Sequence, residues 1–138
     1  FEYWDKNDDD PLNTGVMDDS VRPVFDAGLV DLVETDHRIS DEIYLESTPG
    51  HTPGHVSVHI ESDGQQALIT GDCIHHPCQI AVPDWCSSAD YDQEVAQQTR
   101  IDLLEQYSDE EVLIIGTHFA TPTAGYLKKR GNDYQLEV

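Results

Sequence analysis

Residues Thr48 to His55 read TPGHTPGH, so two prolines, two glycines and two histidines lie within eight positions. Strand-like segments flank this stretch, IYLES at Ile43–Ser47 before it and VSVHI at Val56–Ile60 after it. Proline fixes φ and glycine adopts conformations closed to other residues, so such a loop orders at a low entropic cost. We therefore predict a tight loop that holds an imidazole at a sheet edge. The alternative is a proline-glycine turn with incidental histidines.

Two later segments are each an apolar strand followed by a side chain that can bind a metal. Residues Ala67 to Asp72 read ALITGD, and residues Val112 to His118 read VLIIGTH. A histidine loop, an aspartate at one strand end and a histidine at another supply the nitrogen and oxygen donors that zinc prefers. Together the three segments predict a metal site.

The order GHTPGH, GD and GTHF resembles the C-terminal half of the metallo-β-lactamase superfamily, and most nearly its lactonase and organophosphate-hydrolase-like branch. The resemblance implies an α/β fold, half of an αββα sandwich with a mixed sheet and flanking helices. It covers residues 1–138, which we expect to form a single partial domain. Members carry an upstream HxHxDH motif that supplies the other half of the metal site, and this string does not occur here. With Phe1 as the first residue, we expect a processed, clipped or partial chain.

The resemblance implies that His51 binds one metal, Asp72 bridges both metals as the catalytic carboxylate, and His118 binds the second. The cofactor would be zinc, with iron or manganese as alternatives. Zinc lowers the pKa of its bound water to about 7, which makes hydroxide available to attack a lactone, ester, amide or phosphotriester. Each residue also has a structural reading: a loop hydrogen bond for His51, a turn cap for Asp72 and a partly buried position for His118.

Other side chains near these motifs are candidates for supporting the ligands or lining a substrate pocket. His55 is expected to orient the loop, and His75 and His76 follow Asp72 where the resembling branch places its pocket. Both could also be ordinary loop histidines, and we favour that interpretation slightly. Trp85 and Phe119 are expected either to line an apolar pocket or simply to pack.

The loop from Cys73 to Ser88 offers an alternative zinc site. Cys73, Cys78 and Cys86 would form it together with His75 or His76. The C-x4-C-x7-C spacing lacks the tight cysteine pairs that open such sites, so we disfavour it.

The strongly acidic composition limits the classes of partner that the chain can bind. With 28 acidic residues against 7 lysines and arginines, the formal charge is −21, which argues against nucleic acid and anionic membranes as partners. The resemblance implies a small-molecule substrate. Adaptation to high salt explains this charge, and an acidic mesophilic protein is the alternative. Three cysteines suggest reduced thiols and a cytoplasmic location, although truncation would hide a signal peptide. The acidic run from Asp5 to Asp10 imitates a calcium loop but lacks its glycine and its glutamate, so we interpret it as a solvated connector.

Periodicity and turn signals predict the remaining elements. His59 is expected on the polar, exposed face of a hairpin that turns at Asp63-Gly64. The helix that ends near Tyr107 is expected to be capped by Ser88 or Asp90. The predicted elements are a helix at 20–27, a strand at 29–33, a hairpin of 55–62 and 65–70, a long loop at 73–88, a helix to 107 with Val95, Ile101, Leu103 and Leu104 inside, a strand at 110–115, a short helix at 125–130 and an edge strand at 134–138.

Half of a sandwich leaves the inner face of its sheet open, so we expect a partner: the missing N-terminal half, or a second copy that forms a dimer. The favoured function is a metal-dependent hydrolase present as a C-terminal fragment, inactive until the missing ligands are supplied. The alternative is a non-catalytic binding or assembly fragment that dimerises through the exposed sheet face.

Overall fold

The computed structural model describes residues 1–7 and 15–138 and divides into two compact units, residues 1–34 and 35–138. The first unit contains α1 (Glu2–Lys6), a π-helical turn η1 (Met17–Val21) and α2 (Arg22–Asp26). The rings of Phe1 and Phe25 stack with centroids 4.6 Å apart, and Met17 is buried. Residues 8–10 of the acidic run considered for calcium lie outside the described residues. No helix in the described part of the chain is long and apolar enough to cross a membrane.

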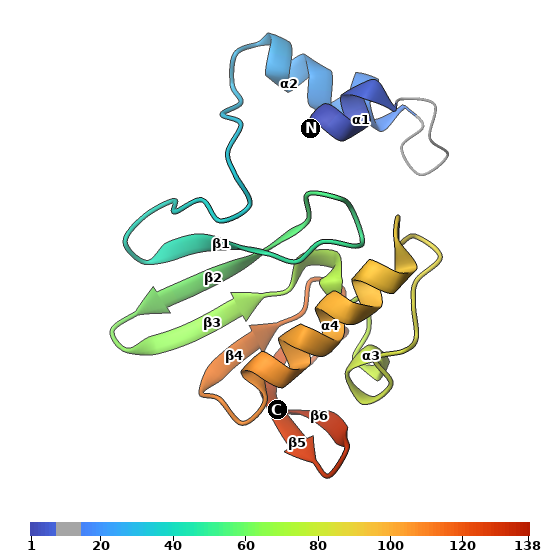
Figure 1. The fold of residues 1–138 in the computed structure, drawn as a ribbon. Coiled ribbons are helices and arrows are strands. Elements are labelled where there is room, and N and C mark those ends of the chain that lie inside the picture. Colours follow the sequence, from blue (N-terminus) through green and yellow to red (C-terminus); the bar gives the residue numbers. More distant parts are fainter. Residues whose placement is uncertain (8–14) are drawn as a thin grey trace. The chain divides into compact units, whose positions relative to one another are not determined.

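In the second unit, six strands form one mixed sheet whose order follows the chain from β1 to β6 (Figure 1). Strands β3 and β4 are parallel, and every other neighbouring pair is antiparallel. A parallel pair needs a crossover connection, and the long helix α4 (Gln93–Tyr107) supplies it. The strands are β1 (Ile43–Ser47), β2 (Val56–Ser62), β3 (Gln65–Ile69), β4 (Val112–Ile115), β5 (Ala124–Arg130) and β6 (Asp133–Glu137). The expected mixed sheet with flanking helix is thus confirmed.

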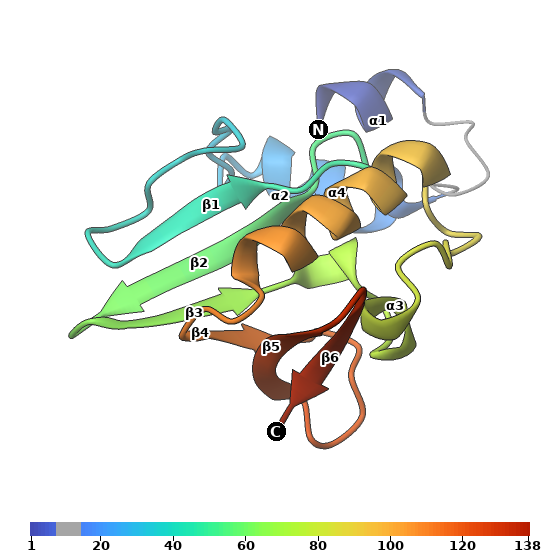
Figure 2. The same cartoon turned by 60° about the horizontal axis from the view of Figure 1, so that its bottom comes forward.

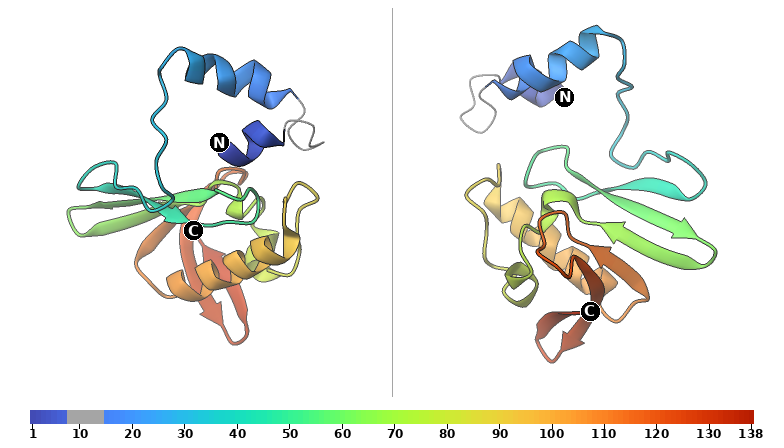
Figure 3. Two further views of the ribbon diagram at one scale, coloured as in Figure 1. Left: turned by 45° about the horizontal axis from the view of Figure 1, so that its top comes forward. Right: turned by 180° about the vertical axis from the view of Figure 1, so that it is seen from behind.

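Helix α4 covers one face of the sheet, as the turned views in Figure 2 and Figure 3 also show. Its buried Leu103 and Leu104 belong to the same core cluster as Leu68 of β3, Ile114 of β4 and Leu127 of β5. Register places Leu68 opposite Ile114, so these side chains share a face. The opposite face is also apolar but only half-buried; it carries Leu45, Val58, Ile60, Ala67, Ile69, Leu113 and Ile115.

The turns of the sheet follow their sequence signals. Asp63 and Gly64 both have positive φ, at 51° and 77°, as the predicted Asp-Gly hairpin turn requires. The helix cap differs from the prediction, because Asp92 caps α4 by accepting the Val95 N–H at 3.1 Å. Asp90 is instead buried. The predicted loop at 73–88 also holds a short helix, α3 (Cys78–Ala81).

Two element predictions were wrong. Residues 125–130 belong to strand β5, because pairing with both β4 and β6 overrides the local helix signal. Residues 29–33 form no strand; Leu29 and Leu32 are largely exposed, and the apolar pattern there finds no neighbouring strand among the described residues.

The expected surface position of His59 was also wrong. It is only 4% exposed, because the face that reads as polar in β2 is the face that α4 covers. Its ring stacks on Tyr44, and its Nδ1 lies 3.4 Å from the Tyr107 hydroxyl. The inner face of α4 differs from the prediction too, since Val95 is 40% exposed and Arg100 is fully buried.

Candidate metal centre

The histidine loop between β1 and β2 is anchored on the start of α4. Gly50 has φ of 131°, and a Cβ there would lie 2.3 Å from the Ala96 Cα, so only glycine allows this close approach. The backbone N–H groups of Tyr91 and Asp92 donate to the carbonyls of His51 and Gly50, at 3.1 Å and 3.0 Å. The loop that carries His51 is therefore fixed from the helix side.

Asp72 lies between two histidines at one edge of the sheet. It belongs to η2, a 3-10 turn (Gly71–Cys73) that follows β3, and His118 follows β4. Because β3 and β4 are parallel, their carboxyl ends meet at that edge. Asp72 Oδ1 lies 2.6 Å from His118 Nε2, and Asp72 Oδ2 lies 3.4 Å from His51 Nε2. The structure thus brings together the three residues that the sequence singled out as ligands.

His55 supports Asp72 through the backbone. Its Nε2 accepts the Asp72 N–H at 2.9 Å, so its Nδ1 carries the proton and donates to the Thr48 carbonyl at 2.9 Å. Burial lowers the pKa of His55, which favours this neutral form. A Cβ on Gly71 would lie 2.7 Å from the His55 ring nitrogen, so the turn that presents Asp72 requires glycine.

His75 lies beside both predicted histidine ligands. Its ring centroid is 4.9 Å from that of His51 and 5.8 Å from that of His118. Burial lowers the pKa of His75 as well, and its Nδ1 is buried without a hydrogen-bond partner. The backbone N–H of His75 donates to the side chain of the buried Gln79 at 2.8 Å. His75 is therefore a neutral, firmly held imidazole with a nitrogen available to a ligand.

The other predicted pocket residues do not join this group. His76 is exposed, and its Nδ1 accepts the Cys78 N–H. Trp85 is 60% exposed, whereas Phe119 is 5% exposed and packs in the core. The cysteines, which are all unpaired, take no part in the cluster of possible metal ligands found among the described residues.

The donor set fits a divalent transition metal. Imidazole nitrogens and carboxylate oxygens are zinc ligands, and here they converge with one buried imidazole nitrogen still unpartnered. In the described part of the chain, the side chains whose ligand atoms all lie within 4.8 Å of one another are those of His51, His75 and Asp90. Asp90 was not expected from the sequence beyond a capping role, and a carboxylate gives no local signal of burial.

Comparison with known proteins identifies the family of the chain. The sequence profile of the metallo-beta-lactamase superfamily matches residues 2–126. No curated protein matches the chain significantly.

Solved structures agree on the fold. AidC, a dizinc quorum-quenching lactonase in complex with a product, is 23% identical over 85% of this chain and 38% of its own, with a TM-score of 0.73. The hydrolase AbOPH is 23% identical over 85% and 40%, with a TM-score of 0.77. An N-acyl homoserine lactone hydrolase with its product at the catalytic metal centre is 27% identical over 67% and 36%, with a TM-score of 0.57. This chain spans less than half the length of each of the three.

Proposed function

The chain belongs to the metallo-beta-lactamase superfamily, and from this premise we propose that it supplies His51, Asp72 and His118 to the metal centre of a lactonase-like hydrolase. One observation carries the proposal: the two oxygens of Asp72 face two different imidazoles, each at its Nε2. A carboxylate with one oxygen toward each imidazole would suit a site in which Asp72 helps to hold two cations. Bound zinc supplies a hydroxide nucleophile at neutral pH and polarises the scissile carbonyl or phosphoryl group.

The protein's own groups hold this centre in place. His55 fixes the backbone of Asp72, and the start of α4 fixes the loop of His51. His75 lies beside the ligands, and we propose that it contacts the substrate or replaces a missing ligand. The proposed substrates are lactones first, with esters, amides and phosphotriesters as alternatives, since lactonases and a further hydrolase are among the similar structures.

Metal content tests this proposal directly. The chain is analysed in about 2 M salt, where the Debye length is below about 3 Å and the acidic surface is screened. We expect zinc, iron or manganese, with less metal in His51→Ala and Asp72→Ala. His37→Ala, which removes an exposed histidine, is the matched control. Unchanged metal in both site variants would contradict the assignment. Metal-loaded protein is then assayed on lactones and phosphotriesters.

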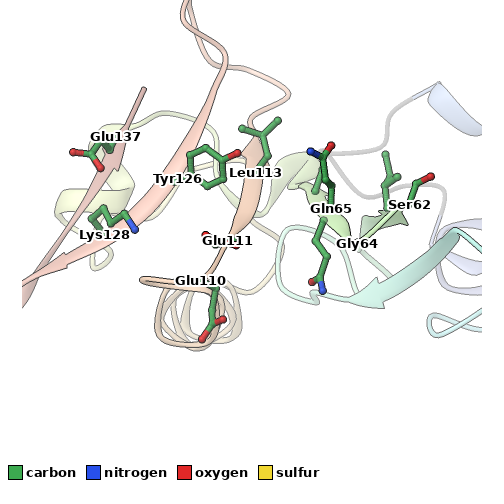
Figure 4. A pocket seen from close by; sticks show the side chains of 12 residues that line it. Ser62, Gly64, Gln65, Glu110, Glu111, Leu113, Tyr126, Lys128 and Glu137 are labelled. Carbon is green, nitrogen blue, oxygen red and sulfur yellow. The ribbon is translucent and has the colours of Figure 1, made fainter.

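A second candidate function is favoured by the open face of the sheet. A hollow of about 610 Å³ lies over Ile60, Ala67 and Leu113, and Tyr126 beside them is 44% exposed (Figure 4). An apolar sheet face requires a second layer. We propose that a second β layer covers it, either from the same polypeptide or from a second copy. In the latter case the chain is an assembly unit without chemistry of its own.

The mass in solution separates these two cases. If a second copy covers the face, the wild-type chain sediments as a dimer and Tyr126→Asp sediments as a monomer. Glu105→Gln, on the exposed side of α4, is the control and should leave the mass unchanged. A wild-type monomer would remove the case for self-assembly.

Two proposals concern the setting of the protein. The cytoplasmic location rests on its unpaired cysteines, and adaptation to high salt rests on its charge of −21. Both stay predictions.

A further inference from the structure

Two oppositely charged side chains are fully buried behind the proposed metal ligands. The side chains of Asp90 and Arg100 are both 0% exposed, and Asp90 Oδ2 lies 3.8 Å from Arg100 Nη2. Charged side chains are almost never fully buried unless they are paired, and a buried pair stabilises a fold no better than apolar residues of the same volume. Core packing alone therefore does not account for this pair.

Asp90 points its other oxygen at a metal ligand. Its Oδ1 lies 3.2 Å from His51 Nδ1, while its Oδ2 accepts the Ser87 N–H at 2.9 Å. Both oxygens are thus engaged by groups of this chain. That leaves Asp90 poorly suited to bind a metal itself, although its oxygen is close to the nitrogens of His51 and His75.

Arg100 faces Asp90 as an ion pair, because its Nη2 makes no hydrogen bond, and it fixes the surrounding loop in one arrangement through its other nitrogens. From the buried side of α4, its Nε donates to the Cys73 carbonyl at 3.2 Å. Its Nη1 donates to the carbonyls of Pro83 and Trp85, at 2.7 Å and 3.2 Å. One guanidinium therefore ties together both ends of the segment that leads from Asp72 to Asp90. Such a fork of fixed donors is a property of arginine that lysine lacks.

The consequence concerns the protonation of His51. An ionised carboxylate only accepts hydrogen bonds, so Asp90 requires the proton on Nδ1 of His51. The lone pair then lies on Nε2, the nitrogen that faces Asp72 at 3.4 Å. A histidine ligand whose second nitrogen donates to a carboxylate has its tautomer and ring orientation fixed.

We propose that Asp90, buried beside the charge of Arg100, is the positioning residue that fixes the Nδ1–H tautomer of His51 and aims its Nε2 at the metal. The role in metal binding rests on the proposed function, in which His51 is a ligand. The tautomer itself does not, because Asp90 imposes it without metal.

The first test is the tautomer of His51 in the metal-free, full 138-residue chain. Long-range ¹H–¹⁵N NMR at about pH 9, well above the ordinary histidine pKa of about 6.5, reports which ring nitrogen carries the proton. We expect Nδ1–H in the wild type and a mixture of tautomers in Asp90→Asn. Nε2–H, donated to Asp72, or a mixture in the wild type would overturn the proposal. Since the decisive spectrum is that of the wild type, a variant that fails to fold does not affect it.

The second test is zinc affinity, measured by competition with a chelator. Loss of a carboxylate behind a ligating histidine lowers affinity by about 10- to 100-fold, and we expect this for Asp90→Asn. The control is Asp102→Asn, which removes an exposed carboxylate on α4 and is expected to stay within about threefold of the wild type. Equal affinity of the two variants would overturn the role of Asp90 in metal binding. If the wild type binds no zinc, the proposed function fails, and the tautomer still decides whether Asp90 orders His51.

Discussion

Replacing Arg100 by methionine is the sharpest test of the buried network, because methionine keeps the length of the side chain and removes its charge and donors. The change leaves the fully buried Asp90 without its cation. It also removes the donor to the Cys73 carbonyl and both donors to the carbonyls of Pro83 and Trp85.

The magnitude follows from these contacts. Removing one partner of a buried ion pair costs about 3–5 kcal/mol, because the other charge remains buried. A buried carbonyl left without a donor costs about 1–3 kcal/mol; the contact to Cys73 is buried, whereas the other two are partly buried and can gain water. These effects overlap, so we expect a loss of about 5 kcal/mol in the free energy of unfolding. That is a large part of the roughly 5–15 kcal/mol typical of a domain.

Urea unfolding in high salt, followed by far-UV circular dichroism, measures the loss. Urea is uncharged and does not screen the acidic surface. The double variant Asp90→Asn/Arg100→Met removes both charges. We expect its loss in the free energy of unfolding to be about 1–3 kcal/mol smaller than the sum of the losses in the two single variants. A loss below about 1.5 kcal/mol in Arg100→Met, or strict additivity in the double variant, would refute the view that this pair is coupled and buried.

Two further predictions concern charge and pH. With a net charge of −21, the melting temperature should rise as salt is increased from about 0.1 M to about 2 M, because the Debye length falls from about 10 Å to below about 3 Å; a constant melting temperature would contradict self-repulsion. Burial and the hydrogen bond to Glu46 raise the pKa of Tyr107, so above about pH 10 the unfolded chain loses a proton that the folded chain keeps, and stability falls by about 1.4 kcal/mol per pH unit. Urea unfolding measured at several pH values should show a smaller decrease in the free energy of unfolding above about pH 10 for Tyr107→Phe than for the wild type. The same decrease per pH unit in both proteins would contradict a raised pKa of Tyr107.

The positions of His51, Asp72 and His118 at a loop and at two strand ends could be predicted from the sequence, because they depend on local signals. Proline and glycine mark the His51 loop, and apolar runs mark β3 and β4, whose ends carry Asp72 and His118. The Asp63-Gly64 turn fixes the hairpin in the same way. Parallel pairing then brings the strand ends to one edge without any further information.

The sheet faces could not be predicted in this way. Alternation in β2 gives one apolar face with Val58 and Ile60 and one polar face with Ser57 and His59. The rule that apolar faces are buried predicts that the face with Val58 and Ile60 is covered, yet α4 covers the polar face. Ser57 tolerates burial there, because its hydroxyl donates to the Thr70 carbonyl at 3.1 Å. A buried polar face is therefore a property of tertiary partners, which the strand's own sequence does not contain.

The same limit explains why Asp90 and Arg100 were missed, and it bears on how the site is built. A charged residue in a helix is read as exposed, and only its position four residues from Ala96 and from Leu104 places Arg100 on the inner face. Burying that charge is costly, so we interpret Arg100 as fixing the geometry of the loop rather than adding to the stability of the fold. The contacts agree, since each of its hydrogen bonds goes to backbone of the segment between Asp72 and Asp90. A metal centre needs ligands held to within about 0.5 Å, and fixed hydrogen-bond geometry supplies that better than apolar packing does.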